Sequence, residues 1–205
     1  MKKLFYVKPS LHLPDTIAIV GPSKSILKKK YGKKIEKSKF IVRFNFAKTK
    51  GFEKHTGSRT NLMVINNHVY DFLKNKNKSL QKIKKYLVIS PFELKKFRSN
   101  LSLYFFEKKK NQYLLAFKFA NHFGIFFSLL KILIRRKTLS VGFCFIILCI
   151  LSGIKLDIYG FDLNEDMRKR KHYFKKLKIG NVHDLVAEHS ILNRLKNHNL
   201  INFNY

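Results

Sequence analysis

Short apolar runs alternate with polar and helical stretches along most of this 205-residue chain. The runs are four to six residues long and rich in β-branched and aromatic residues, which is typical of buried strands. Strands are predicted at residues 16–20, 40–44, 61–65, 86–89, 101–106 and 155–160. Helices are predicted at residues 25–34, 141–151 and 184–196. Strands that alternate with helices indicate a single α/β domain with a mostly parallel central sheet.

The turns that follow these strands are where a ligand site is expected, because ligands of parallel sheets bind beyond the carboxyl ends of the strands. Gly21-Pro22-Ser23 follows the first strand, Asn45 follows the second, and Gly160 ends the strand that begins at residue 155. A glycine directly after a strand lets the backbone approach a phosphate, and a helix that starts just beyond favours an anion. Many strand-to-helix turns share this pattern, so it does not name a ligand.

The charge balance is strongly basic, since 43 Lys and Arg against 12 Asp and Glu give a formal net charge of +31. A hydrophobic content of 45% and an aromatic content of 14% exclude a disordered basic tail, which would lack the apolar surface needed to fold. Only 8 of the 43 cations are arginine, and surfaces that recognise base edges usually use more of it. The charge therefore indicates an anionic partner without naming it.

The cysteines and the apolar stretches of the sequence indicate in which cell compartment the protein works. Cys144 and Cys149 form no CxxC pair, so they are predicted to be small buried hydrophobes in a reducing compartment. The N-terminal segment lacks the apolar core of a signal peptide. The apolar stretches 123–134 and 141–151 are shorter than the roughly 18 to 20 residues of a spanning helix, so buried helices are favoured. Peripheral contact with an anionic membrane stays open, because cations flank both stretches.

A longer signal lies in residues 40–60, which read FIVRFNFAKTKGFEKHTGSRT. This segment resembles the long sialyl motif of the eukaryotic-type sialyltransferases, glycosyltransferase family 29. The residues that match in order and spacing are Arg43, Asn45, Ala47, 49–53 and 57–60. With the first strand and its turn, the motif spans residues 15–66.

Three further motifs of the family follow in the same order. Residues 138–162 are similar to the short sialyl motif, which runs from a Ser-Thr-Gly turn through an apolar helix to Val-Tyr-Gly-Phe. His172-Tyr173-Phe174 resembles the third motif, and the segment from His183 to Glu188 fits the very short motif, His-x-x-x-x-Glu. Residues 1–205 are therefore assigned to one catalytic domain, in which residues 67–137 form a variable region without a resemblance.

The resemblance implies a Rossmann-like domain of the GT-A-variant type and a glycosyltransferase that needs no cofactor or metal. Its donor would be the CMP conjugate of sialic acid or of Kdo, both acidic 2-keto sugars. The sugar would be transferred with inversion to a hydroxyl of a cell-surface oligosaccharide or glycolipid. The sequence agrees with metal independence, because it has no Asp-x-Asp pair that could hold a divalent ion against a diphosphate.

Two histidines carry the chemistry that the resemblance implies. His183 would be the general base for the acceptor hydroxyl, and we expect it in the first turn of the last helix, with Asn181 as the N-cap. His172 would contact the donor phosphate and support its departure. Without the motifs, each histidine would be interpreted as structural.

The other site residues are carried over in the same way. Those expected to bind the donor are Gly21, Pro22, Ser23, Asn45, Ser140, Val141, Gly142, Phe161 and Asp162. Of these, residues 140–142 would meet the cytidine or its ribose, and the backbone around Phe161 would line the pocket. Glu188 is expected to orient the last helix, and Arg59 to be a buried, paired structural residue.

Four positions depart from the family pattern. Pro22 stands where the long motif has Asn, and Val141 stands where the short motif has Thr, so two polar groups near the donor are missing. Ile17 and Gly153 occupy the places of the family's disulfide cysteines. These departures leave the choice between sialic acid and Kdo open. They also favour a short bacterial-type member in the cytoplasm, at the inner face of the cytoplasmic membrane.

Two alternatives remain. The lysine clusters at 28–30 and 108–110 and the basic run 168–171 would suit a nucleic-acid-binding protein. However, no helix-turn-helix, RRM or zinc pattern is present, and the lysines are scattered, so nucleic acid is the disfavoured partner. The other alternative is a family fold that binds the donor without turnover.

Overall fold

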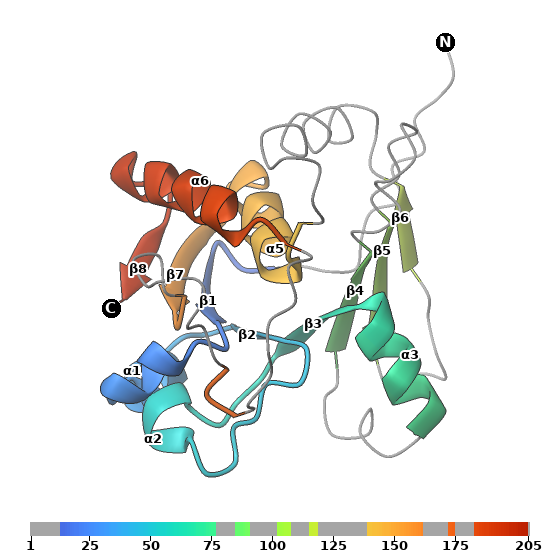
Figure 1. Cartoon of the computed structure of the whole chain (residues 1–205), viewed down its shortest axis with the longest axis horizontal. Coiled ribbons are helices and arrows are strands. Elements are labelled where there is room, and N and C mark those ends of the chain that lie inside the picture. The colour runs from blue at the N-terminus through green and yellow to red at the C-terminus, as the bar shows by residue number, and fades with distance from the viewer. Residues whose placement is uncertain are drawn as a thin grey trace.

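The computed structural model describes residues 13–76, 85–90, 102–107, 115–118, 139–161, 172–174 and 183–204. Within these residues the strands form one eight-stranded sheet, in the order β6-β5-β4-β3-β2-β1-β7-β8 (Figure 1). The strands are β1 (Thr16–Val20), β2 (Ile41–Phe44), β3 (Leu62–Asn66), β4 (Lys85–Ser90), β5 (Ser102–Glu107), β6 (Leu115–Lys118), β7 (Lys155–Tyr159) and β8 (Asn202–Asn204). The pairs β4–β3, β3–β2, β2–β1, β1–β7 and β7–β8 are parallel, and the pairs β4–β5 and β5–β6 at one edge are antiparallel. The predicted mostly parallel sheet is confirmed.

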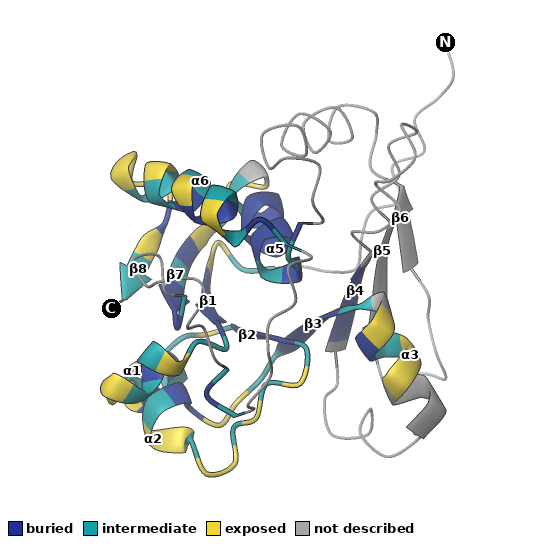
Figure 2. Ribbon diagram, viewed as in Figure 1, coloured by how far each residue is buried: buried dark blue, intermediate teal, exposed yellow. Residues whose placement is uncertain are grey.

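Helices cover both faces of this sheet. They are the 3₁₀ helix η1 (Lys24–Lys28), α1 (Gly32–Glu36), α2 (Glu53–Thr56), α3 (Asn67–Lys76), α5 (Val141–Leu151) and α6 (Leu185–Asn197). Figure 2 shows α5 almost wholly buried, whereas α1, α2 and α6 each present an exposed outer side. The α/β architecture expected from the alternating pattern is therefore present.

The central strands are mostly apolar because both faces of the sheet are covered, as parallel sheets require. In β1, Ile17 and Ile19 pack into the larger core, which also holds residues of α5 and α6. Ala18 and Val20 point to the opposite face, where they pack with Ile26 of η1 and with α1. Burying one such aliphatic side chain contributes about 1.5–3 kcal/mol.

The prediction of one helix over residues 25–34 is wrong, because the segment forms η1 and α1 with a break between them. Gly32 begins α1 instead of closing a longer helix. A Cβ on Gly32 would clash with the carbonyl oxygen of Glu53, so the glycine is required by the close packing of α1 on α2. The apolar stretch 123–134 lies outside the described residues.

α5 is the apolar helix that the sequence predicted over residues 141–151. Cys144 and Cys149 are buried in it, as expected, and burial raises the pKa of both thiols. Ser140 caps the helix, because its hydroxyl accepts a hydrogen bond from the Phe143 backbone N–H at 3.2 Å. In the part of the chain that is described, no helix has both the length and the apolar character to cross a membrane.

The loop between β2 and β3 is anchored by Arg43, which is fully buried inside β2. One terminal nitrogen of its guanidinium donates to the Thr56 carbonyl at 2.6 Å, and Nε donates to Thr60 Oγ1 at 3.0 Å. Burial lowers the pKa of Arg43, although nearby Tyr173 and Glu36 oppose the shift. The buried charge therefore ties the far end of the loop to the strand from which the loop departs.

The same loop is held from outside by Glu36 of α1. Its carboxylate accepts hydrogen bonds from the backbone N–H of Ser58 and of Arg59 and pairs with Arg59 Nε at 2.6 Å. Arg59 is paired, as expected, but it is not buried: 47% of its side chain is exposed. The buried arginine of the motif is Arg43, because it lies on the central strand whereas Arg59 lies at the end of a surface loop.

The Glu36 pair makes stability depend on pH. Burial raises the pKa of Glu36, but hydrogen bonds from Arg59 and Ser58 outweigh it and lower the pKa from 4.5 to about 2. A lowered carboxylate pKa stabilises the fold above pH 4.5, and this contribution is lost as the pH falls towards 2. We expect Glu36→Gln to lower the free energy of unfolding by about 1 kcal/mol at pH 7, since the pair is partly exposed to solvent.

Urea unfolding of both proteins at pH 7, 5 and 3 measures this difference. It should be equal at pH 7 and 5 and smaller at pH 3, because at pH 3 Glu36 is protonated in the unfolded wild type, whereas its carboxylate in the folded state, with a pKa of about 2, is not. A difference that is the same at all three values would contradict the assignment.

Candidate functional site

The order of the strands reverses between β1 and β7, with β2 to β4 on one side and β8 on the other. In parallel sheets a ligand crevice forms at such a reversal, outside the carboxyl ends of the two strands. Here those ends carry the turn Gly21-Pro22-Ser23 after β1 and the residues Gly160 and Phe161 after β7. The two turns lie at the point where the sequence motifs place the donor.

The two turns touch through their backbones. The Gly21 N–H donates to the Tyr159 carbonyl at 2.7 Å, and the Ser23 N–H donates to the Gly160 carbonyl at 3.1 Å. A Cβ on Gly21 would clash with the Gly160 carbonyl and lie 2.5 Å from the ring of Phe161. Gly160 has a φ of +67°, and a Cβ there would lie 2.8 Å from the Gly21 carbonyl oxygen. Glycine is therefore required at both positions by the closeness of the turns.

The structure places His172 beside the turn after β1. His172 forms an isolated antiparallel bridge with Ser23, and the Tyr173 N–H donates to the Pro22 carbonyl at 3.0 Å. The segment 172–174 therefore runs alongside the first turn like a short added strand. A histidine that lies 150 residues away in the sequence is thus fixed beside the glycine turn.

Tyr173 holds this segment, and the sequence interpretation gave it no role of its own. Its hydroxyl donates to the Lys48 carbonyl at 2.5 Å, and its ring packs edge-to-face on Phe52 with centroids 4.9 Å apart. Burial raises the pKa of Tyr173, which keeps the hydroxyl protonated as a donor, although nearby Arg43 opposes the shift. The signal in the sequence was that Tyr173 is itself part of the third motif, His172-Tyr173-Phe174.

Asn45 stands at the carboxyl end of β2 with a φ of +50°, a left-handed conformation that asparagine tolerates better than most residues. Its side-chain oxygen accepts a hydrogen bond from the Asn66 N–H at 3.2 Å, at the end of β3. Its side-chain NH₂ group can serve as a donor to a ligand.

Phe161 joins the turn to the start of α5. Its ring lies against Gly21, and a Cβ on Gly142 would lie 3.2 Å from the same ring. On its other side, the ring packs edge-to-face on Phe44, with centroids 6.0 Å apart. The residues expected around the donor at 21–23, 140–142 and 161 are therefore neighbours. Asp162 lies outside the described residues.

Glu188 links α6 to the start of α5. It is only 2% exposed, and its carboxylate accepts hydrogen bonds from the Ser140 N–H and the Ser140 hydroxyl, each at 2.6 Å. Ser140 thus directs both of its polar hydrogens to Glu188 while its oxygen caps α5. Val141, the next residue, is buried.

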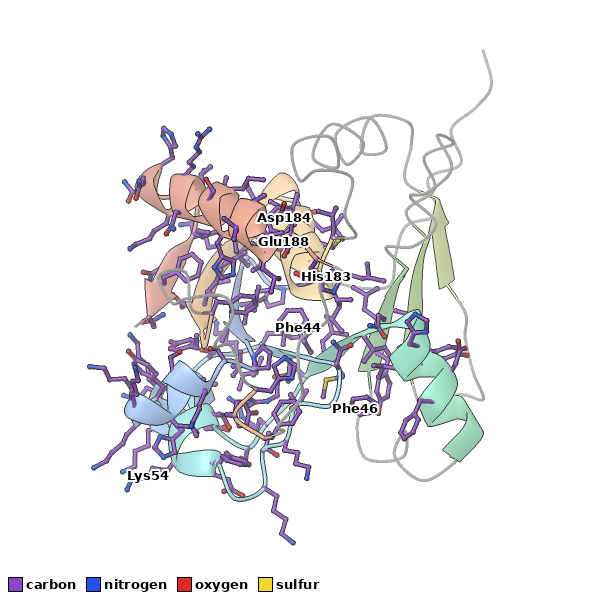
Figure 3. All side chains as sticks on the ribbon, in the orientation of Figure 1. Phe44, Phe46, Lys54, His183, Asp184 and Glu188 are labelled. Carbon is purple, nitrogen blue, oxygen red and sulfur yellow. The ribbon has the colours of Figure 1, made fainter. Side chains whose placement is uncertain are left out.

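His183 lies just before the N-cap of α6, so the prediction that it lies in the first helical turn is wrong. The N-cap is Asp184, whose side chain accepts a hydrogen bond from the Ala187 N–H at 3.2 Å. Asn181, the expected cap, lies outside the described residues. Figure 3 shows His183, Asp184 and Glu188 together where α6 begins, next to α5. His183 is therefore held near the start of α5 through Glu188 and Ser140.

An exposed aromatic pair was not predicted. Phe46 follows Asn45, and its ring meets Phe72 of α3 edge-to-face, with centroids 5.4 Å apart. The two side chains are 37% and 44% exposed. Phe46 lies two residues beyond the end of β2 and continues its apolar pattern. The sequence therefore gives no sign that the ring is exposed.

Comparison with known proteins agrees with this arrangement. Residues 12–200 match the family model "Glycosyltransferase family 29 (sialyltransferase)". Two crystal structures of a mammalian sialyltransferase share the fold, with TM-scores of 0.59 and 0.56 and 20% sequence identity. The superpositions cover 93% and 92% of this chain and 68% of the other, and the second structure is a complex with Gal-β-1-3GalNAc-ortho-nitrophenol.

A curated relative matches over a shorter stretch. The β-1,6-galactosyltransferase GALT29A of Arabidopsis thaliana is 44% identical over 52 residues, which is 25% of this chain and 13% of that protein. The match thus spans about an eighth of that relative's length. With a family model that covers nearly the whole chain and a GT-A-like fold shared with sialyltransferases, this protein belongs to glycosyltransferase family 29.

Proposed function

We propose that the protein is an inverting, metal-independent glycosyltransferase that moves sialic acid, or the related sugar Kdo, from its CMP conjugate to a hydroxyl of an oligosaccharide or glycolipid. The observation that supports this most is the meeting of family motifs at one strand reversal. The glycine turn after β1, the start of α5, Phe161 and His172 come together there, although they are up to 150 residues apart in the sequence.

The donor binds at the carboxyl edge of β1, β2 and β7 in this proposal. The turn at residues 21–23 lets the donor approach the backbone closely, and the side-chain NH₂ of Asn45 supplies a hydrogen bond. The cytidine lies against residues 140–142. His172 is beside the same turn and donates a hydrogen bond to the phosphate, which stabilises the charge that develops as CMP departs.

His183 takes the proton of the acceptor hydroxyl in the same step. The hydroxyl oxygen forms a bond to the anomeric carbon while the bond from that carbon to the phosphate oxygen breaks, and CMP leaves with the electron pair. Attack from the face opposite to CMP inverts the anomeric centre, and the transition state resembles an oxocarbenium ion. A positioned base supplies about 10²- to 10⁴-fold in rate. Glu188 and Ser140 keep the start of α6, and so His183, in place.

Metal independence follows from the chemistry of the leaving group. A monophosphate develops less charge on departure than a diphosphate, so the hydrogen bond from His172 suffices without a divalent cation. The chain has no Asp-x-Asp pair, the common metal-binding pattern of transferases that use diphosphate sugars.

A second candidate is the transfer of galactose, because the Arabidopsis relative is named as a galactosyltransferase and is 44% identical over the matched stretch. The sequence has lost two polar groups of the motifs, at Pro22 and Val141, and these changes alter the surroundings of the donor. Galactose is therefore included as a donor in the test.

The direct test is release of CMP from CMP-sialic acid and from CMP-Kdo, with release of UDP from UDP-galactose measured in parallel. We expect CMP release from one of the first two donors and a loss of roughly 10²- to 10⁴-fold in kcat for His183→Ala. His198→Ala is the matched control, since His198 is exposed at the far end of α6.

Full activity of His183→Ala would show that the base is assigned wrongly. Turnover of UDP-galactose alone would replace the proposed donor with the second candidate. Binding of CMP without turnover of any donor would favour a fold that has lost its activity.

Binding at the β1 turn can be tested separately by thermal unfolding with and without CMP, since a ligand of the folded state raises Tm. We expect Gly21→Ala to remove the stabilisation by CMP, because the new methyl group displaces the Gly160 carbonyl or the Phe161 ring. Gly51→Ala is the control, since a Cβ there meets nothing within 4 Å. Gly51 has a φ of +85°, so the control loses some stability but keeps the shift with CMP.

If both glycine variants kept the full shift with CMP, the nucleotide would bind elsewhere.

The exposed pair Phe46–Phe72 is the acceptor side of the site in this proposal, because it adjoins Asn45 and offers aromatic surface to the apolar face of a sugar ring. We expect Phe46→Ala to raise the KM for the acceptor roughly 5- to 30-fold, as for the loss of about 1–2 kcal/mol of packing, with the KM for the donor unchanged. Leu200→Ala removes an exposed side chain at the end of α6 and is the control.

An equal rise in both KM values would place Phe46 at the donor instead.

A further inference from the structure

All eleven lysines between residues 24 and 54 are exposed, and we call this set the lysine face. They lie on η1, α1, α2 and the loops that join these helices to the sheet. In Figure 3 their long side chains fan outward from this layer, with Lys54 labelled on α2. The face is built by the fold, because Ile26 and Ile35 of the same helices are buried against the sheet and turn the lysines outward.

Little negative charge opposes the lysine face. Residues 24–54 contain two acidic side chains, Glu36 and Glu53. Glu36 already pairs with Arg59, so its charge is compensated locally. The surface therefore has a strong positive potential that requires an anionic partner or mobile counterions.

The chemistry of the face favours a lipid surface over a nucleic acid. Every exposed cation in residues 24–54 is a lysine, a compact point charge that suits the diffuse potential of anionic headgroups. Recognition of nucleic acid usually adds arginine forks and exposed aromatic rings on which bases stack. Among the described residues of η1, α1 and α2, no large hydrophobic side chain is exposed.

The lysine face adjoins the candidate site. The turn after β1 leads directly into η1, and the Lys48 carbonyl accepts the hydrogen bond of Tyr173, next to His172. A surface that binds the lysine face would thus lie close to the crevice at the carboxyl ends of β1 and β7.

We propose that the lysine face docks the protein onto the surface of an anionic lipid bilayer. The attachment is peripheral and electrostatic, since η1, α1 and α2 expose lysines and no large apolar side chain, and Phe46, at 37% exposure, is the one large apolar side chain exposed within residues 24–54. Docking does not depend on the donor or on turnover, so it can fail or hold independently of the proposed activity.

The test is co-sedimentation of the full chain with vesicles of phosphatidylcholine that contain 30% phosphatidylglycerol, at 50 and 150 mM salt. We expect binding to these vesicles, weaker binding at the higher salt, and none to pure phosphatidylcholine. The variant Lys30→Gln, Lys33→Gln, Lys37→Gln should bind roughly 10- to 100-fold more weakly, because each lysine near an anionic surface contributes to the attraction.

The matched control is Lys155→Gln, Arg194→Gln, Lys196→Gln, which removes the same charge from β7 and α6, outside the lysine face. It should bind within roughly 3-fold of the wild type, since charges farther than a Debye length from the lipid are screened. Thermal unfolding shows whether each triple variant is folded, and the single variants Lys33→Gln and Lys37→Gln serve if one is not.

An equal loss in the two triple variants would overturn the proposal, since net charge and not the lysine face would then drive binding. The absence of binding to the anionic vesicles at 50 mM salt would also overturn it. Tighter binding to a 20-base-pair DNA duplex than to the vesicles at 150 mM salt would assign the face to nucleic acid instead.

Discussion

The contact between the turns that end β1 and β7 is the constraint on which the site depends. Two backbone hydrogen bonds join the turns, and neither Gly21 nor Gly160 has room for a side chain. This contact fixes where Phe161 leaves β7, and the ring of Phe161 in turn sets how closely α5 approaches. A reversal of strand order opens a crevice in any parallel sheet, and here the two glycines let the two turns and the Phe161 ring pack closely beneath it.

The two histidines of the proposed mechanism are held by separate supports. His172 is held by a bridge to Ser23, and its neighbour Tyr173 is tied to the β2–β3 loop that Arg43 anchors from within. His183 is held on the other side of the sheet, where Glu188 fixes the start of α6 to the start of α5. In the proposed mechanism, the hydrogen-bond donor to the phosphate and the base for the acceptor act on opposite faces of one sugar and need this kind of independent placement.

The sequence predicted the sheet well because buried parallel strands are short apolar runs that leave a strong signal. Two strands of the described sheet were missed, the four-residue β6 and β8. β8 is three residues long, polar at Asn202 and Asn204, and forms by pairing with β7. The helix expected over 25–34 failed because Gly32 meets the backbone of α2, a tertiary contact that local pattern does not contain.

The candidate site was predicted from motifs and not from residue chemistry. Motif order identified His172 and the turn at 21–23, and the structure shows why they belong together. Roles that arise only from packing were not predicted: the burial of Arg43 in place of Arg59, the anchoring by Tyr173 and the exposure of Phe46. Each depends on which side of a strand or loop is covered in three dimensions.

The most direct measurement of the central claim is a crystal structure of the protein with CMP bound. The account predicts the phosphate within hydrogen-bond distance of the His172 ring, above the turn at residues 21–23, with the cytidine against residues 140–142. CMP bound away from the carboxyl ends of β1 and β7 would contradict the account.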